Sequence, residues 1–220
     1  MNVRVFPVFA TLLLSATAAQ GQVCLGLASL ETRPMNVTAS AVFMDGANGG
    51  DARFGFGTPK VFGGVSAKVV KSDGVSGTTK GAGVDGGMSF HVGASKRAML
   101  CPIASVEYLK SPDFNDGEGG TIEASATGAT AGLAIGGVIN SSSGIGFIPF
   151  AAVRAAYNRI SVSSGSFSQS SSDTYGILSG GLSLVFNPSV LVRPFVQVPV
   201  GLDGADPSYG VGLSFAFGKR

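Results

Sequence analysis

The chain has 220 residues, 34 of them glycine, and only 13% are charged. Its 15 basic and 13 acidic residues nearly balance, at a formal net charge of +2, which argues against a surface built to bind nucleic acid. The mean hydropathy of +0.37 is typical of membrane proteins, yet no run of 18 apolar residues follows the N-terminal segment.

The N-terminal segment has the pattern of a secretory signal peptide. Arg4 supplies a positive charge, residues 5–14 are mostly apolar, and Ala16, Thr17 and Ala18 are small residues at the spacing of a cleavage site. A membrane helix would need about 20 apolar residues, so the segment is too short to be one. We expect a signal peptide over residues 1–21, a periplasmic segment over 22–34 and one domain over 35–218.

After this segment, apolar residues alternate with small or polar residues, which is the period of a β-strand with two different faces. Met35 begins the first such segment, and the last one carries apolar residues at 209, 211, 213, 215 and 217. The expected strands are 35–44, 52–58, 61–71, 80–93, 101–109, 121–139, 145–162, 172–186, 190–200 and 209–217.

Only helices and closed barrels satisfy their backbone groups in lipid, and long apolar runs are absent, so the pattern predicts an all-β, antiparallel, up-and-down transmembrane β-barrel in the cell outer membrane. A soluble β-sandwich is the alternative, since its strands also alternate. Ten strands are expected; eight would remain if 52–58 and a neighbour failed to form.

The connections between these strands fall into two groups. Polar loops at 45–51, 72–79, 110–120, 163–171 and 203–207 follow odd strands, and shorter turns at 59–60, 94–100, 140–144 and 187–189 follow even strands. Outer-membrane barrels carry long loops outside and short turns in the periplasm. We therefore expect extracellular ligands or surface partners at loops 72–79, 110–120 and 163–171, lipid around the wall, and a monomer.

Several charged side chains lie on the strand faces opposite the Val, Leu and Phe residues. A charge that faces lipid at the midplane costs roughly 2–4 kcal/mol, so these residues are expected to face the lumen. A network of opposite charges is the simpler interpretation, and a selectivity ring is the alternative. The predicted set is Lys68, Asp85, His91, Glu107, Arg154 and Arg193.

The two cysteines, Cys24 and Cys101, form an even pair in an exported chain, which favours a disulfide. With ten strands both lie at the periplasmic rim, and the bond requires their Cα atoms to be within about 7 Å. One histidine and two separate cysteines do not indicate a metal site, and no cofactor motif is found.

Catalytic patterns are weak. The single histidine, His91, is four residues before Ser95, and a Ser–His hydrolase also needs an orienting acid within reach. The glycine runs at 117–120 and 180–181 match no phosphate-binding loop, because neither leads into a helix. We expect no enzymatic activity; a lipid-modifying enzyme is the remote alternative.

Taken together, the signal peptide, Cys24, Cys101-Pro102, residues 200–204 (VGLDG) and residues 209–218 (YGVGLSFAFG) resemble the small outer-membrane β-barrel domain proteins of Gram-negative bacteria. The resemblance covers residues 23–220 and implies architecture and compartment. It does not choose among adhesins, small pores, enzymes and structural barrels. We expect a structural or loop-mediated interaction role, with a narrow passive pore as the alternative.

Overall fold

The computed structural model describes residues 23–27, 33–74, 76–92, 98–115, 121–140, 145–164 and 167–218. Within them the chain is almost entirely β-sheet, with one short 3-10 turn, η1 (Val23–Leu25). None of the helical structure in these ranges could span a membrane.

Ten long strands form the wall. They are β1 (Met35–Met44), β2 (Ala47–Gly57), β3 (Val61–Ser72), β4 (Thr79–Met88), β6 (Ala98–Lys110), β8 (Thr121–Gly137), β10 (Gly146–Ser164), β11 (Phe167–Asn187), β12 (Val190–Val200) and β13 (Ser208–Phe217). Three short strands pair with members of the wall: β5 (Phe90–Val92) with β6, β7 (Phe114–Asn115) with β8, and β9 (Ile139–Asn140) with β10.

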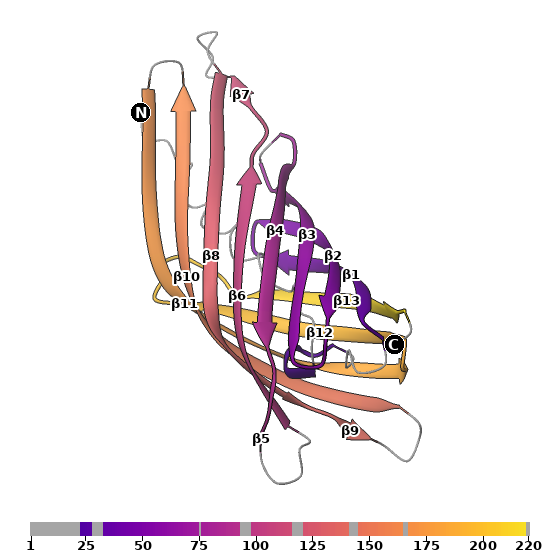
Figure 1. The fold of residues 1–220 in the computed structure, drawn as a ribbon. Helices are drawn as coiled ribbons and strands as arrows, with labels where there is room; N and C mark the ends of the chain where they lie inside the picture. The colour runs from indigo at the N-terminus through magenta and orange to yellow at the C-terminus, as the bar shows by residue number, and fades with distance from the viewer. Residues whose placement is uncertain are drawn as a thin grey trace.

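The wall is a closed antiparallel ring (Figure 1). Each strand pairs with its neighbours along the chain, and the ring closes because β1 pairs with β13 from Met35–Phe217 to Phe43–Tyr209. Closure removes the sheet edges that a bilayer cannot satisfy. The predicted ten-strand barrel is confirmed, and the eight-strand alternative is not the one formed.

The two faces of the wall differ as the alternation predicts. On β13, Ser214 and Ala216 are buried inward, whereas Leu213, Phe215 and Phe217 are exposed on the outer surface. The same inside–outside alternation continues around the ring, for example on β10. We call the end that holds Met35 and Phe217 the periplasmic end, because both ends of the barrel domain and the turns 58–60 and 188–189 lie there, whereas the longer loop 201–207 lies at the other end.

The predicted loop over 45–51 is wrong, and so is the short second strand over 52–58. Only Asp45 and Gly46 connect β1 to β2, and Met44 pairs directly with Ala47. Gly46 has φ +67°, a left-handed conformation that an Asp-Gly pair adopts readily in a two-residue hairpin. As a result β2 has 11 residues and the outer rim is low at this point.

The predicted loop over 163–171 is also wrong. β10 continues to Ser164 and β11 begins at Phe167, with residues 165–166 outside the described ranges. β8, β10 and β11 therefore rise well beyond β1–β4 (Figure 1). About 9–11 residues cross a bilayer, and β11 has 21, so a large part of these strands lies outside the membrane. We call residues 161–164 and 167–174 the protruding hairpin.

The remaining loops follow the sequence prediction more closely. The described residues 73–74, 76–78, 111–113 and 201–207 lie between strands at the outer end, and β7 follows residue 113; residues 75 and 116–120 are outside the described ranges. The predicted signal peptide, 1–21, likewise lies outside them and stays a prediction.

Candidate functional site

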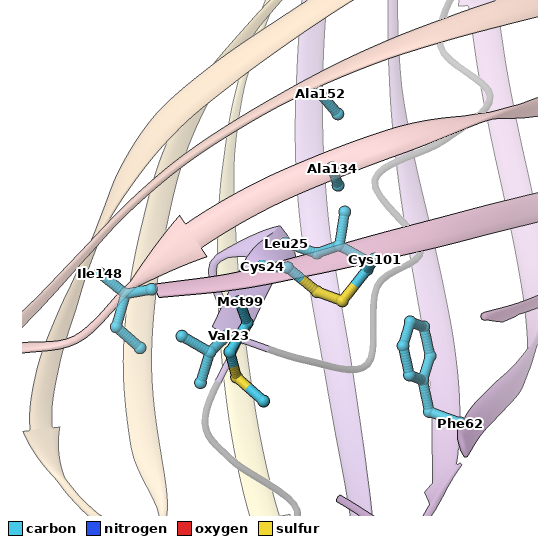
Figure 2. Close-up of a cluster of buried hydrophobic side chains, with 9 residues drawn as sticks. All are labelled: Val23, Cys24, Leu25, Phe62, Met99, Cys101, Ala134, Ile148 and Ala152. Carbon is cyan, nitrogen blue, oxygen red and sulfur yellow. A yellow bond between two sulfur atoms is a disulfide. The ribbon is translucent and has the colours of Figure 1, made fainter. Parts of the chain in front are cut away.

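The lumen is filled in three layers. The periplasmic layer is apolar and consists of Val23, Cys24, Leu25, Phe62, Met99, Cys101, Ala134, Ile148 and Ala152 (Figure 2). The outer layer is also apolar and consists of Ala47, Val70, Leu109, Ala124, Ala126 and Ile160. Charged and polar side chains form most of the middle layer between them, together with the apolar cluster of Val42, Phe150 and Phe195.

The periplasmic layer is built around a segment that is not part of the wall. Val23, Cys24, Leu25 and Leu27 are at most 2% exposed, because residues 23–27 enter the lumen. We expected this segment in the periplasm before the first strand; the structure places it inside the barrel. We call residues 23–27 the plug.

A disulfide fixes the plug to the wall. Cys24 bonds to Cys101 on β6 with a Cα–Cα distance of 6.1 Å, so the predicted pairing is confirmed. Figure 2 shows the bond among the apolar side chains of the layer. Two hydrogen bonds add to it: Arg193 Nη1 donates to the carbonyl of Leu25 at 3.1 Å, and Ser183 Oγ donates to the carbonyl of Gly26.

Arg193 links the plug to the middle layer. Its guanidinium carbon lies 5.0 Å from the ring centroid of Phe195 and 5.6 Å from that of Phe150, so both ring faces contact the cation. Since Arg193 is buried, these rings and the Leu25 carbonyl supply much of what water would otherwise provide.

The first ion pair of the middle layer joins β2 and β4. Arg53 donates from Nε and Nη2 to the two carboxylate oxygens of Asp85 at 2.9 and 2.6 Å, a bidentate arrangement. Asn36 on β1 accepts a third bond from Arg53 at 3.4 Å. Gly64 leaves the space for this guanidinium, since a Cβ there would lie 2.4 Å from the Arg53 Cζ.

The second ion pair joins β3 and β6. Lys68 Nζ donates to Glu107 Oε2, and both side chains are buried. On β10, Arg154 extends the layer by donating to Gln197 and Ser179, each at 3.4 Å. Buried charges are costly unless they are paired and hydrogen-bonded, and here the wall supplies the partners.

The structure brings most of the predicted lumen charges together. Lys68, Asp85, Glu107, Arg154 and Arg193 all face the interior. His91 does not join them: it lies opposite Met99 on the same sheet face, but on β5, where it is exposed.

Two inward charges were missed by the sequence analysis, Asp51 and Arg53, both buried on β2. The predicted loop over 45–51 hid them. The alternation of Arg53 with Phe54 and Phe56 was a signal that could have placed them inward.

The cavity between the periplasmic and middle layers is small. It has a volume of about 20 Å³ and is lined by side chains that include Leu25, Lys68, Asp85, Glu107 and Arg154. That volume holds about one water molecule. In the part of the chain that the structure describes, the lumen is therefore a packed core with a charged centre.

The outer surface of the wall is apolar, in contrast to the charged centre of the lumen. Large apolar side chains such as Val65, Val84, Val106 and Leu178 are about half exposed around the wall. Aromatic side chains border this band at the outer side, where Phe43 pairs with Tyr209. They also border it at the periplasmic side, where the Phe54 and Phe217 rings lie 6.3 Å apart. An apolar band between two aromatic borders is the surface of a membrane-spanning barrel.

The chain is a β-barrel of the outer-membrane type. It has a ten-strand ring, charged side chains inside the lumen and an apolar band on the outer surface. Comparison with solved structures agrees. The chain is similar to the translocator domain of the autotransporter NalP from Neisseria meningitidis, with 13% identity, a TM-score of 0.51, and coverage of 84% of this chain and 89% of that domain. This likeness supports the fold alone.

Two further structures share the likeness more weakly. The transport unit of the autotransporter AIDA-I from Escherichia coli has 13% identity and a TM-score of 0.49, with 97% of each chain covered. Ail, the attachment invasion locus protein of Yersinia pestis, has 14% identity and a TM-score of 0.44, with 84% of this chain and 99% of Ail covered. No family model and no curated protein matches the sequence.

Proposed function

We propose that the protein is a sealed outer-membrane barrel that acts through its outer rim, by contact with surface partners, and does not conduct solutes. The observation that carries this proposal is the filled lumen: an apolar plug below, paired charges in the middle and a second apolar layer above. A passage for solutes needs a continuous polar path, and two apolar layers interrupt it.

The same observation weighs against two other roles. A narrow passive pore would need the plug and the outer layer to move apart together. NalP is a translocator domain, but transport of a chain through this lumen would displace the Arg53–Asp85 and Lys68–Glu107 ion pairs. Each displaced ion would lose its buried partner, at a cost of several kcal/mol.

The protruding hairpin supports the contact role. β11 pairs with β12 from Gly176 onward, so among the described residues the edge of β11 from Phe167 to Tyr175 has no neighbouring strand on that side. Most side chains of this edge are exposed and polar, and Phe167 at its end is 61% exposed. An open strand edge is a surface to which an extended peptide segment can add by backbone hydrogen bonds.

Conductance in planar bilayers tests the sealed lumen. We expect the purified, folded protein to insert without discrete channel openings, and to remain closed after Cys24→Ser, because the outer layer does not depend on the disulfide. Stable, reproducible channel openings of the unmodified protein would contradict the proposal. Heat-dependent gel mobility confirms folding in each preparation.

The contact role has its own test. Cells that express the protein should adhere to a surface-bound partner only when the hairpin is intact. A version with residues 161–170 replaced by Asn-Gly keeps the pairing of Ile160 with Ser171 and should lose adhesion while keeping heat-dependent mobility. Equal adhesion of both versions would contradict this part of the proposal. The expectation that the chain is not an enzyme stays a prediction.

A further inference from the structure

A pair of lysines faces outward at the outer rim, beside the protruding strands. Lys80 on β4 and Lys110 on β6 are direct cross-strand partners, and both side chains are exposed on the outer face of the wall. Directly opposed side chains have Cβ atoms about 5 Å apart, and like charges in this position repel. An anion bound between the two ammonium groups would therefore reduce this repulsion.

The surroundings of the pair form a hollow that is open to solvent. It has a volume of about 540 Å³ and is lined by Lys80, Lys110, Thr78, Ser111 and Pro112. The two loops that supply the last three residues are joined, since the hydroxyls of Thr79 and Ser111 are hydrogen-bonded at 3.1 Å and both residues are buried. The hollow thus combines two ammonium groups and the Thr78 side chain with a frame that the Thr79–Ser111 hydrogen bond holds together.

The height of the hollow indicates what would fill it. Tyr108 lies two residues before Lys110 on the same outward face and is half exposed, with the apolar Val106 below it. Tyrosine at the border of the apolar band marks the level of the lipid headgroups. Lys71, exposed on the adjacent strand β3, adds a third cation at this rim.

Among the described residues, the nearby carboxylates form ion pairs with Lys110 alone. Lys110 Nζ lies 3.5 Å from Glu123 Oε1 and 3.7 Å from Asp113 Oδ1, and all three side chains are about half exposed. Exposed pairs of this kind are weak. In the described part of the chain, Lys80 forms no ion pair within 4.0 Å, so its ammonium group is available to an anion.

We propose that this hollow binds the phosphate group of an anionic glycolipid in the outer leaflet. A phosphate monoester has three oxygens that accept hydrogen bonds, and Lys80 and Lys110 would donate to it from the two sides. The barrel would then hold a specific lipid against the β4–β6 face. The orientation of the barrel in the membrane is the part of the proposed function on which this inference rests.

Native mass spectrometry of the folded protein in detergent tests the proposal, with bisphosphorylated lipid A as the probe. We expect a one-to-one complex, and at least a fivefold weaker affinity for the Lys80→Gln/Lys110→Gln variant. Lys60→Gln is the matched control, because Lys60 is exposed in the turn at the opposite end and its loss should leave binding unchanged. Glu123→Gln should strengthen binding, since it frees Lys110.

Three results would overturn the proposal. They are unchanged affinity in the double variant, equal binding of lipid A with both phosphates removed, and competition by millimolar inorganic phosphate, which would make the site one for free anions. Heat-dependent gel mobility shows that each variant is folded. If the protein conducts ions and still binds lipid A, the sealed-lumen proposal is wrong and the lipid-site proposal stands.

Discussion

The two ends of the lumen are closed in different ways. At the periplasmic end, the plug enters from outside the wall and is held by the disulfide and by Arg193. At the outer end, side chains of the wall itself meet, among them Val70, Leu109 and Ile160. One closure depends on a short tethered segment, whereas the other is inseparable from the strands. Substitutions at the two ends should therefore differ in effect.

The largest effect is expected from the charged layer that separates the two ends. Glu107→Gln removes the carboxylate that pairs with Lys68 and leaves that ammonium buried, at a cost of about 3–5 kcal/mol in the free energy of unfolding. Urea unfolding in lipid vesicles measures it.

Glu123→Gln is the control for this prediction, because Glu123 pairs with Lys110 at the exposed rim and its side chain is 54% exposed against 9% for Glu107. It should leave the unfolding free energy nearly unchanged. Equal losses in the two variants would show that burial does not govern these pairs.

The next effect is the loss of the covalent tether. The sequence separation of the two cysteines is 77 residues, and closing a loop of that size stabilises the folded state by about 4 kcal/mol in the chain-entropy model. Cys24→Ser/Cys101→Ser should lower the unfolding free energy by about 2–4 kcal/mol.

Intact-mass measurement of the unreduced protein gives an independent check on the tether. The bond removes two hydrogens, and alkylation should find no free thiol. Two free thiols in protein taken from membranes would refute the tethered closure.

The smallest expected effect is the difference in stability between two matched variants on β10. Ile148 lies in the periplasmic layer and Ile160 in the outer layer, and both are buried on the same strand face. Each Ile→Ala change should cost about 2–5 kcal/mol. We expect Ile148→Ala to cost about 1 kcal/mol less than Ile160→Ala, because the short plug can shift to fill a cavity more easily than the wall can. A larger loss of unfolding free energy in Ile148→Ala than in Ile160→Ala would show that the plug adapts less easily than the wall.

Much of the barrel could be predicted from the sequence, because period-two alternation is a direct consequence of strand geometry in lipid. Segments such as 35–44 and 190–200 coincide with β1 and β12. The sequence predictions were wrong where residues typical of loops form strands. Gly49, Gly50 and Asp51 look like a loop, but the Asp45-Gly46 turn makes them part of a strand. The serines at 163–164 on β10 and at 168 and 170–171 on β11 lie in strands outside the membrane, where no apolar face is needed.

The lumen was predicted less completely than the wall. Alternation shows which side chains point inward, and so it found Lys68, Glu107, Arg154 and Arg193, but it does not show which partners meet across the barrel. Alternation could not predict the plug, because residues 23–27 form no strand and therefore lack the period of two. The even cysteine pair was the one indication that residues near Cys24 approach the wall.

The pairing of β1 with β13 has a consequence for assembly. Thr38 Oγ1 donates to Ser214 Oγ at 3.0 Å across this pairing, although the two residues are 176 positions apart. Contacts of such separation form late, because the intervening chain must first be ordered. Until β13 arrives, two strand edges remain unpaired. We therefore expect release from any assembly machinery to depend on the last ten residues of the wall, Ser208–Phe217, and a chain interrupted before them to persist as an open, aggregation-prone sheet.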